Sequence, residues 1–259
     1  MSASPSVFAA MRQALAGAVP LVVVTVVSGD GTGQKLAVLP DSTVGSLGTV
    51  ELDELAVPEA RRLLDDERSL TQSYPGEAGE IELFYEVFPP PPTLLIFGAV
   101  HVAQALATFG KQLGFRVIVT DARAKLLTAE RFPTSDQLIQ AWPEDAIAQT
   151  SIDRNTYVAI LTHDPKFDEP ALLGTLSTEA RYIGAVGSRK TSDDRRIRLT
   201  EAGATEVQLA RIRGPIGLNI GASTPEEMAI AILAEIIAVR HGRDAQPLTN
   251  TTGSIRARV

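Results

Sequence analysis

The sequence predicts a protein of the α/β class, with a small N-terminal α+β domain and a C-terminal domain built on a doubly wound parallel sheet. Four consecutive prolines at residues 89–92 favour an extended segment and suit a linker. After them, short apolar strands alternate with helix-like segments, as a parallel sheet wrapped by helices requires. We therefore expect domains at residues 1–88 and 94–243, a proline-rich linker at residues 89–93 and a loose tail at residues 244–259. A long proline loop inside a single domain is the alternative.

The N-terminal domain begins with helix-like spacing over residues 7–18. The run LVVVTVV at residues 21–27 is rich in β-branched side chains and predicts a buried strand. A second strand is expected at residues 35–39, because the turn-rich sequence GDGTG lies between the two. The remaining expected elements are a helix at residues 51–67 and a weakly alternating strand at residues 83–88.

The C-terminal domain alternates strands and helices in order along the chain. Strands are expected at residues 93–97, 116–120, 157–161 and 181–186. Helices are expected at residues 102–113, 169–176 and 225–240. The last of these is read as amphipathic, with an acidic first turn and a basic last turn, and Thr224 stands where an N-terminal cap belongs.

Composition excludes several classes of function. The chain of 259 residues has no cysteine, which excludes disulfides, iron–sulfur clusters, thiolate zinc sites and cysteine nucleophiles. Its net charge of −7 argues against broad binding to nucleic acid or anionic membranes. The strongly apolar run at residues 21–27 is far shorter than the ~20 residues of a membrane span and lacks the basic region of a signal peptide. We expect a cytoplasmic protein with no membrane and no nucleic-acid partner.

The turn after residue 97 resembles a dinucleotide-binding fingerprint. A strand enters the turn at Gly98 and a helix follows, with Ala103 at the last small position of G-x-G-x-x-G/A. This predicts a Rossmann-like domain. The middle glycine is replaced by Val100, whose side chain should partly block a pyrophosphate. Asp121 follows the second strand near the offset at which a carboxylate holds a ribose, which favours NAD over NADP if a dinucleotide binds.

Other polar residues follow the strands of the predicted sheet, at the edge where ligands bind in such folds. His163 and Asp164 follow one strand and are the catalytic candidates if the protein is an enzyme, and a Ser-Arg-Lys loop begins at Ser188. A cationic loop beside an imidazole and a carboxylate suits an anionic, phosphate-bearing ligand. No metal site is predicted. The candidate ligand-binding residues are Gly98, His101, Val102, Asp121, His163, Asp164, Gly187, Ser188 and Arg189.

These motifs together resemble the XdhC/CoxI family. The resemblance rests on the turn at residues 98–103 with its histidine, the sequence LTHD ending at Asp164, the sequence IGAVGSRK ending at Lys190, and residues 215–227 before the last helix. It implies an N-terminal XdhC/CoxI domain joined to a Rossmann-like domain. It also implies a non-catalytic accessory role in maturing molybdenum hydroxylases such as xanthine or carbon monoxide dehydrogenase. Such proteins bind the molybdenum cofactor (molybdopterin), protect it and deliver it to the apoenzyme.

The chain departs from the family pattern at three places. Where relatives carry a glycine-rich run ending in a cysteine, this chain reads GSLGTVELD, with Glu51 at the cysteine position. A second family cysteine, in the region of residues 76–79, is also missing. The third departure is Val100, where the family has glycine. A role that needs a thiolate therefore cannot be performed by this chain.

Three hypotheses follow from the sequence. The first is an accessory factor that holds the phosphate of the pterin near residues 98–103 and 188–190. The second is an NAD-dependent oxidoreductase with Asp121 on the ribose and His163 as acid–base group, against which Val100 argues. The third is a regulatory or scaffold protein that binds no small ligand. A homodimer is expected on general grounds, because two-fold assemblies are the commonest oligomers.

Overall fold

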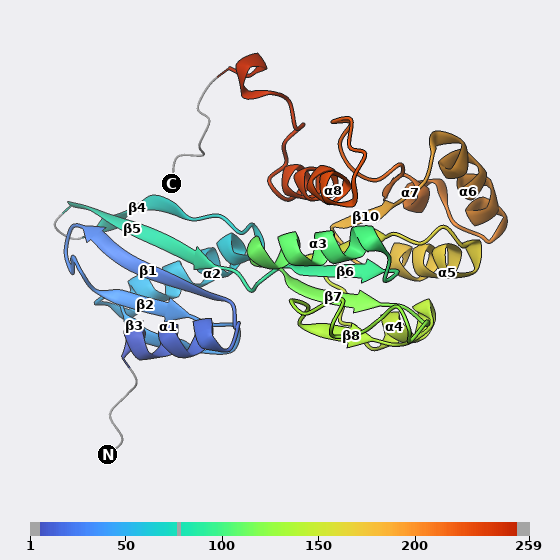
Figure 1. Cartoon of the computed structure of the whole chain (residues 1–259). Helices are drawn as coiled ribbons and strands as arrows, with labels where there is room; N and C mark the ends of the chain where they lie inside the picture. Colours follow the sequence, from blue (N-terminus) through green and yellow to red (C-terminus); the bar gives the residue numbers. More distant parts are fainter. Residues whose placement is uncertain (1–5, 77–78, 253–259) are drawn as a thin grey trace. The chain divides into compact units, whose positions relative to one another are not determined.

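The structure is a computed structural model that describes residues 6–76 and 79–252. The chain divides into two compact units between Pro90 and Pro91, inside the proline run (Figure 1). In the expected tail, residues 248–250 form a short 3-10 turn, and residues 253–259 lie outside the described residues. Among the described residues, no helix is both long enough and apolar enough to cross a bilayer.

The first unit is a five-stranded antiparallel sheet with one helix on each face. Its strand order is β3-β2-β1-β5-β4. The strands are β1 (Leu21–Ser28), β2 (Lys35–Val38), β3 (Thr43–Ser46), β4 (Leu70–Gly76) and β5 (Gly79–Phe88). The helices are α1 (Val7–Ala16) and α2 (Val50–Asp65).

Strand β1 is apolar along nearly its whole length because it is covered on both faces. Val22 and Val24 pack into a core with the buried residues of α2, whereas Leu21 and Val23 pack with Ala14 of α1. Alternate side chains of a strand point to opposite faces. The unbroken run therefore reflects two hydrophobic layers.

The second unit is a six-stranded parallel sheet with the order β11-β10-β9-β6-β7-β8. Its strands are β6 (Thr93–Phe97), β7 (Arg116–Thr120), β8 (Gln137–Ile139), β9 (Thr156–Ile160), β10 (Tyr182–Ala185) and β11 (Ile212–Arg213). This is the strand order of a doubly wound Rossmann sheet. Successive strands are added on one side of β6 as far as β8 and then on its other side from β9, so the strand order reverses between β6 and β9. In such sheets the crevice at the reversal is the usual ligand site.

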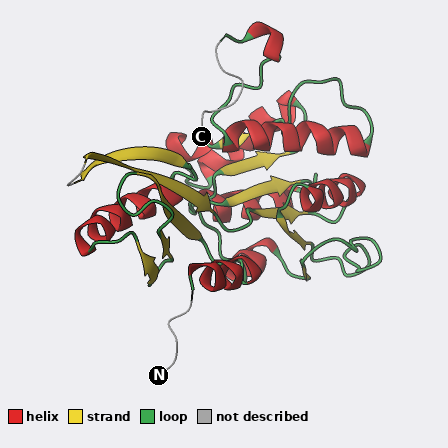
Figure 2. Ribbon diagram, turned by 90° about the vertical axis from the view of Figure 1, so that its left-hand side faces the viewer, coloured by secondary structure: helices red, strands yellow, loops and turns green. Residues whose placement is uncertain are grey.

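Helices cover both faces of the parallel sheet (Figure 2). On one face, α3 (His101–Gln112) and α8 (Pro225–Arg240) pack against Leu94 and Ile96 of β6. On the other face, Leu95 and Phe97 pack with residues of four helices. These are α4 (Pro143–Ala148), α5 (Pro165–Leu176), α6 (Arg189–Glu201) and α7 (Glu206–Leu209). The alternation within β6 fixes which helix lies on which face.

The α/β fold class is confirmed, and so are the strands at residues 93–97 and 116–120 and the helix at residues 225–240. Thr224 caps that last helix and forms a capping box with Glu227, as its position suggested. The amphipathic reading of α8 is only partly right, because Ile230 and Ile237 are exposed.

The elements that the sequence analysis missed are polar or short. Strands β3 and β4 are exposed edge strands, and β8 has three residues. The expected Ser-Arg-Lys loop is wrong: Ser188 is the N-cap of α6, and Arg189 and Lys190 are its first residues. Helix α6 reads RKTSDDRRIRLTE, which lacks an apolar period for sequence analysis to detect.

Candidate functional site

A hollow of about 470 Å³ opens where β6 and β9 end, at the reversal of strand order. We call it the switch-point hollow. It is lined by Val100, Arg123, Thr162, His163, Asp164, Pro165 and Phe167. The sequence analysis named His163 and Asp164 here, and the structure brings both to the hollow. It missed Arg123, Thr162 and Phe167.

The wall of the hollow depends on a tight turn at Gly98. This residue has a φ of +103°, in a region that residues with a side chain rarely adopt. A Cβ atom at Gly98 would lie 2.5 Å from the Cγ2 atom of Thr162. The glycine is therefore needed for two reasons, backbone conformation and the close approach of the segment that follows β9.

Val100 occupies the position of the missing glycine without backbone strain. Its φ of −86° and ψ of 177° are ordinary extended values, and it forms the N-cap of α3. No side chain of the described residues caps this helix, so its first N–H groups lack the usual side-chain acceptor. The valine side chain forms part of the wall of the hollow. Its effect on a bound phosphate remains a prediction.

Asp121 is buried, and internal hydrogen bonds occupy both of its carboxylate oxygens. Oδ2 accepts the N–H of Ala99 at 2.8 Å and Nη2 of Arg123 at 2.8 Å. Oδ1 accepts the backbone N–H of Arg123 at 2.8 Å and its Nε at 2.9 Å. Only 1% of the Asp121 side chain is exposed. The carboxylate therefore ties the turn after β6 to the end of β7, instead of presenting a free acceptor to a ribose.

This pairing sets the pKa of Asp121. Burial alone raises the pKa, but the hydrogen bonds from Arg123 and from the backbone outweigh burial and hold the pKa below its ordinary value of 3.8. The folded state therefore favours the ionised carboxylate more than the unfolded chain does.

A pH-dependent contribution to stability follows from the lowered pKa. The stabilisation by ionised Asp121 should be complete above the ordinary pKa and should be lost as pH falls through the lower folded pKa. We expect the difference in free energy of unfolding between the wild type and Asp121→Asn to be largest at neutral pH and to shrink below about pH 4. Urea unfolding at several pH values, followed by the fluorescence of Trp142, measures it. A difference independent of pH would contradict this role.

Arg123 is held on a ring as well as on a carboxylate. Its Cζ atom lies 5.8 Å from the centroid of the Phe167 ring, and Phe167 stacks on Trp142 at 4.5 Å with an interplanar angle of 3°. The Arg123 side chain is nonetheless 47% exposed. A signal was available in the sequence: an arginine stands two residues after the acidic residue that ends a Rossmann strand.

Asp164 and His163 have different roles at the rim of the hollow. Asp164 is the N-cap of α5, where its Oδ1 accepts the N–H of Lys166 at 3.0 Å. His163 is exposed and borders the hollow. The carboxylate is thus partly committed to the helix start, whereas the imidazole faces the hollow.

A buried polar network fixes the segment that carries these residues. Asp168 on α5 accepts the hydroxyl of Thr162 and, at 3.0 Å, Nη2 of Arg195 on α6. The same Nη2 donates to the carbonyl of Val186 at 2.9 Å. The Asp168 and Arg195 side chains are 4% and 3% exposed. The network joins the ends of β9 and β10 to two helices.

The other predicted residues do not line the hollow. His101 is exposed at the start of α3, and Val102 is half-buried against the core. Ser188 accepts the N–H of Thr191 at 3.0 Å as N-cap of α6, beside exposed Arg189. Gly187 has φ of +149° and joins β10 to that helix. The predicted convergence of all these groups on one crevice is therefore partial.

The first unit contains a hollow of its own, of about 620 Å³, which we call the glycine-loop hollow. Gly48, Thr49 and Glu51 border it, together with apolar Leu55 and Ile81. Thr49 caps α2, so Glu51 stands in the first helical turn. Glu51 is the residue that the sequence analysis aligned with the family cysteine. The second family cysteine was expected in the region of residues 76–79, and residues 77–78 of that region lie outside the described residues.

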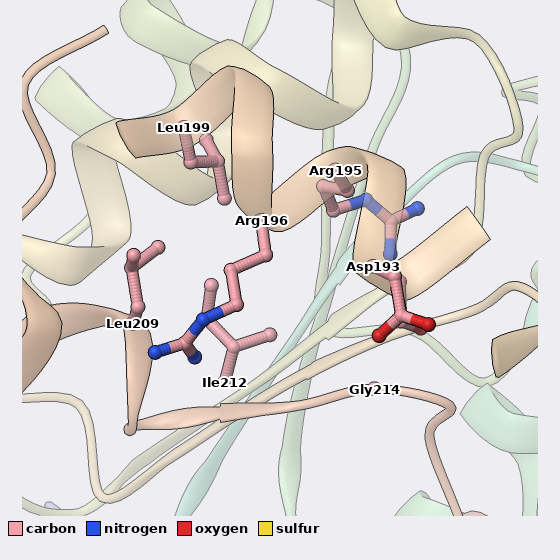
Figure 3. Close-up of a pocket in the computed structure, with 8 residues that line it drawn as sticks. Asp193, Arg195, Arg196, Leu199, Leu209, Ile212 and Gly214 are labelled. Carbon is pink, nitrogen blue, oxygen red and sulfur yellow. The ribbon is translucent and has the colours of Figure 1, made fainter. Parts of the chain in front are cut away.

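A third hollow, of about 150 Å³, lies beneath α6 (Figure 3). Leu199, Leu209 and Ile212 form its apolar wall, and Arg196 extends across it to an ion pair with Glu206. No residue of the predicted ligand set lines this hollow. In the described parts of the chain, no group of three or more histidine, aspartate or glutamate side chains could hold a metal ion.

This chain is similar in sequence to curated proteins and similar in fold to a solved structure. Curated relatives include "Uncharacterized protein YqeB" of Escherichia coli, 34% identical over 63% of this chain and 30% of its own length. A probable xanthine dehydrogenase subunit of Bacillus subtilis is 34% identical over 61% of this chain and 46% of its own length. "Molybdenum cofactor insertion chaperone PaoD" of E. coli is 29% identical over 59% and 42%. The alignments thus span less than half of each relative.

A crystal structure described as a xanthine dehydrogenase from Bacillus halodurans superposes with a TM-score of 0.56. It is 21% identical and covers 93% of this chain and 97% of its own, which shows the fold alone. The XdhC Rossmann domain matches residues 94–236, and the XdhC and CoxI family matches residues 14–75. Because these matches cover most of the chain, in both units, it belongs to the XdhC and CoxI family.

Proposed function

We propose that this protein is an accessory factor in the maturation of a molybdenum hydroxylase of the xanthine or carbon monoxide dehydrogenase type. It binds molybdenum cofactor, or a related phosphate-bearing ligand, and assists insertion into the apoenzyme. The observation that carries the proposal is family membership together with the likeness to a relative named as a molybdenum cofactor insertion chaperone. Asp164, a catalytic candidate, accepts a hydrogen bond as the N-cap of a helix, which agrees better with a delivery role than with catalysis.

The switch-point hollow fits the phosphate end of such a ligand. Arg123 supplies a guanidinium there on a half-exposed side chain, and α3 begins at the wall of the hollow with no side-chain cap. His163 supplies a further polar group at the rim. When bound, the cofactor supplies the redox centre that the partner hydroxylase uses. These residues would bind and orient the ligand.

The glycine-loop hollow does not fit a ligand that needs a thiolate. The chain has no cysteine, and the side chain at the family cysteine position is the carboxylate of Glu51. Our proposal therefore includes no sulfur transfer by this chain. The NAD-dependent alternative is disfavoured by Asp121, because the carboxylate expected to hold a ribose is fully hydrogen-bonded inside the protein.

Native mass spectrometry of protein purified without oxygen tests the proposal. The chain is produced in a host that makes molybdenum cofactor and in a matched host whose pterin synthesis is blocked. We expect an adduct with the mass of a molybdopterin species from the first host only. A dinucleotide adduct from both hosts would support the oxidoreductase alternative. A bare chain from both would contradict cofactor binding and direct the search to protein partners.

A further inference from the structure

The guanidinium of Arg123 has one hydrogen-bonding edge in use, on the Asp121 carboxylate. A guanidinium offers two edges that can each bind two oxygens in parallel, Nε with Nη2 and Nη1 with Nη2. The edge formed by Nε and Nη2 lies on the Asp121 carboxylate, at 2.9 Å and 2.8 Å. Among the described residues, the hydrogen bonds of this guanidinium all go to Asp121. The edge formed by Nη1 and Nη2 therefore has no hydrogen-bond partner among the described residues, and Arg123 is one of the side chains that line the hollow.

The orientation of that edge is fixed before any ligand arrives. Asp121 is buried and holds the guanidinium through two hydrogen bonds, and it also accepts the backbone N–H of Arg123. The guanidinium also lies over the Phe167 ring, and that ring is stacked on Trp142. A donor group held in this way loses little conformational entropy on binding. This arrangement is typical of oxyanion recognition.

Charges around the hollow act in both directions. The Asp121 hydrogen bonds, and more weakly the nearby Asp164 carboxylate, raise the pKa of Arg123, so the arginine stays charged. Asp164 opposes an incoming anion, although it caps α5 at that helix's positive end. The uncapped start of α3 favours an anion. Arg123 is thus the side chain with a cationic, oriented donor edge in the hollow.

We propose that Arg123 is the residue by which the switch-point hollow binds an oxyanion, a phosphate monoester or a carboxylate, and that Asp121 is a positioning residue that orients it. This inference rests on the proposed function only in taking the hollow as the ligand site. It reverses the role expected for Asp121, because the acidic residue binds the protein's own arginine and the arginine meets the ligand.

Isothermal titration of the purified full chain tests the assignment with four probes: inorganic phosphate, acetate, AMP and adenosine. We expect saturable binding of AMP and of at least one simple oxyanion, and no binding of adenosine, which has the ribose diol without the phosphate. Phosphate without acetate would identify a phosphate site, and acetate without phosphate a carboxylate site. Failure of all three anions to bind, or adenosine binding as tightly as AMP, overturns the proposal.

Three variants separate recognition from general charge. Arg123→Lys keeps the positive charge near Asp121 but has no second bidentate edge, so we expect affinity to fall about tenfold or more. Asp164→Asn keeps a side-chain oxygen for the cap and removes the opposing charge, so binding should tighten. Arg116→Met removes a cation at the opposite end of β7 and should leave affinity unchanged. Equal affinity in the wild type and Arg123→Lys, or an equal loss in Arg116→Met, contradicts the assignment.

The fold of each variant is checked independently by circular dichroism and by the fluorescence of Trp142, which stacks beside the site. The titration uses neither pterin nor a hydroxylase. It can therefore fail while the cofactor adduct is found, which would place the adduct elsewhere. It can also succeed where no adduct forms, which would leave an oxyanion site without the proposed function.

Discussion

Replacing Arg195 by methionine is expected to lower the free energy of unfolding of the second unit by about 3–5 kcal/mol. The substitution leaves the carboxylate of Asp168 without its cationic partner. Because that pair is almost wholly inaccessible to water, water cannot solvate the remaining charge. It also removes the donor to the Val186 carbonyl. Urea unfolding followed by the fluorescence of Trp142, the one tryptophan in the sequence, measures the loss.

Two further variants make this result specific. Arg196→Met removes the neighbouring arginine, whose ion pair with Glu206 is exposed, and should cost less than about 1 kcal/mol. The double variant Arg195→Met, Asp168→Leu replaces both charges by apolar groups and should recover much of the stability lost in the single variant. If Arg195→Met and Arg196→Met cost the same, the buried network does not hold the ends of β9 and β10.

Gly98→Ala is expected to be the second most damaging of these substitutions. The positive φ alone costs about 1–2 kcal/mol for a residue with a side chain. The new Cβ atom would also lie 2.5 Å from Thr162 Cγ2 and 3.2 Å from the Thr162 backbone nitrogen, and such overlap costs about 1–3 kcal/mol more. Unfolding in urea checks the sum, and oxyanion titration should show weaker binding because the wall of the hollow moves.

The chain offers a matched control for backbone strain. Gly114, after α3, also has positive φ, at +83°, but a Cβ there would meet no described atom within 4 Å. Gly114→Ala should therefore show the conformational cost without the overlap. Thr162→Ser removes the Cγ2 methyl group and keeps the hydroxyl that donates to Asp168, so it should partly rescue Gly98→Ala. A missing rescue, with equal costs at Gly98 and Gly114, would show that the close approach is unimportant.

Much of the fold could be predicted because burial leaves a local pattern. Strand β6 reads TLLIF, and its side chains alternate between two cores, so a short apolar run followed by a helix indicates a buried parallel strand. Helix α8 combines a cap, a proline at its start and charges at both ends. In contrast, α6 is held by the buried Arg195 and by distant partners, which no local pattern reveals.

The candidate site was predictable in position and less so in role. A doubly wound sheet places a crevice after β6 and β9, and the sequence analysis placed His163 and Asp164 there, where the structure also has them. The Ser188 segment was expected there and instead begins α6. Arg123 was missed because the burial of its neighbour Asp121 and the approach of the Phe167 ring arise only in three dimensions.

By itself the sequence determined the family, the α/β fold class and the absence of any thiolate chemistry, since composition and apolar periodicity are properties of the chain. Tertiary structure decided which charged groups face each other. Asp121 and Arg123 are close in sequence, yet only the folded chain buries the carboxylate against the turn after β6 and pairs it with the arginine. The physical reason is that a buried charge must find its partners in space, whereas an apolar run needs only a face to cover it.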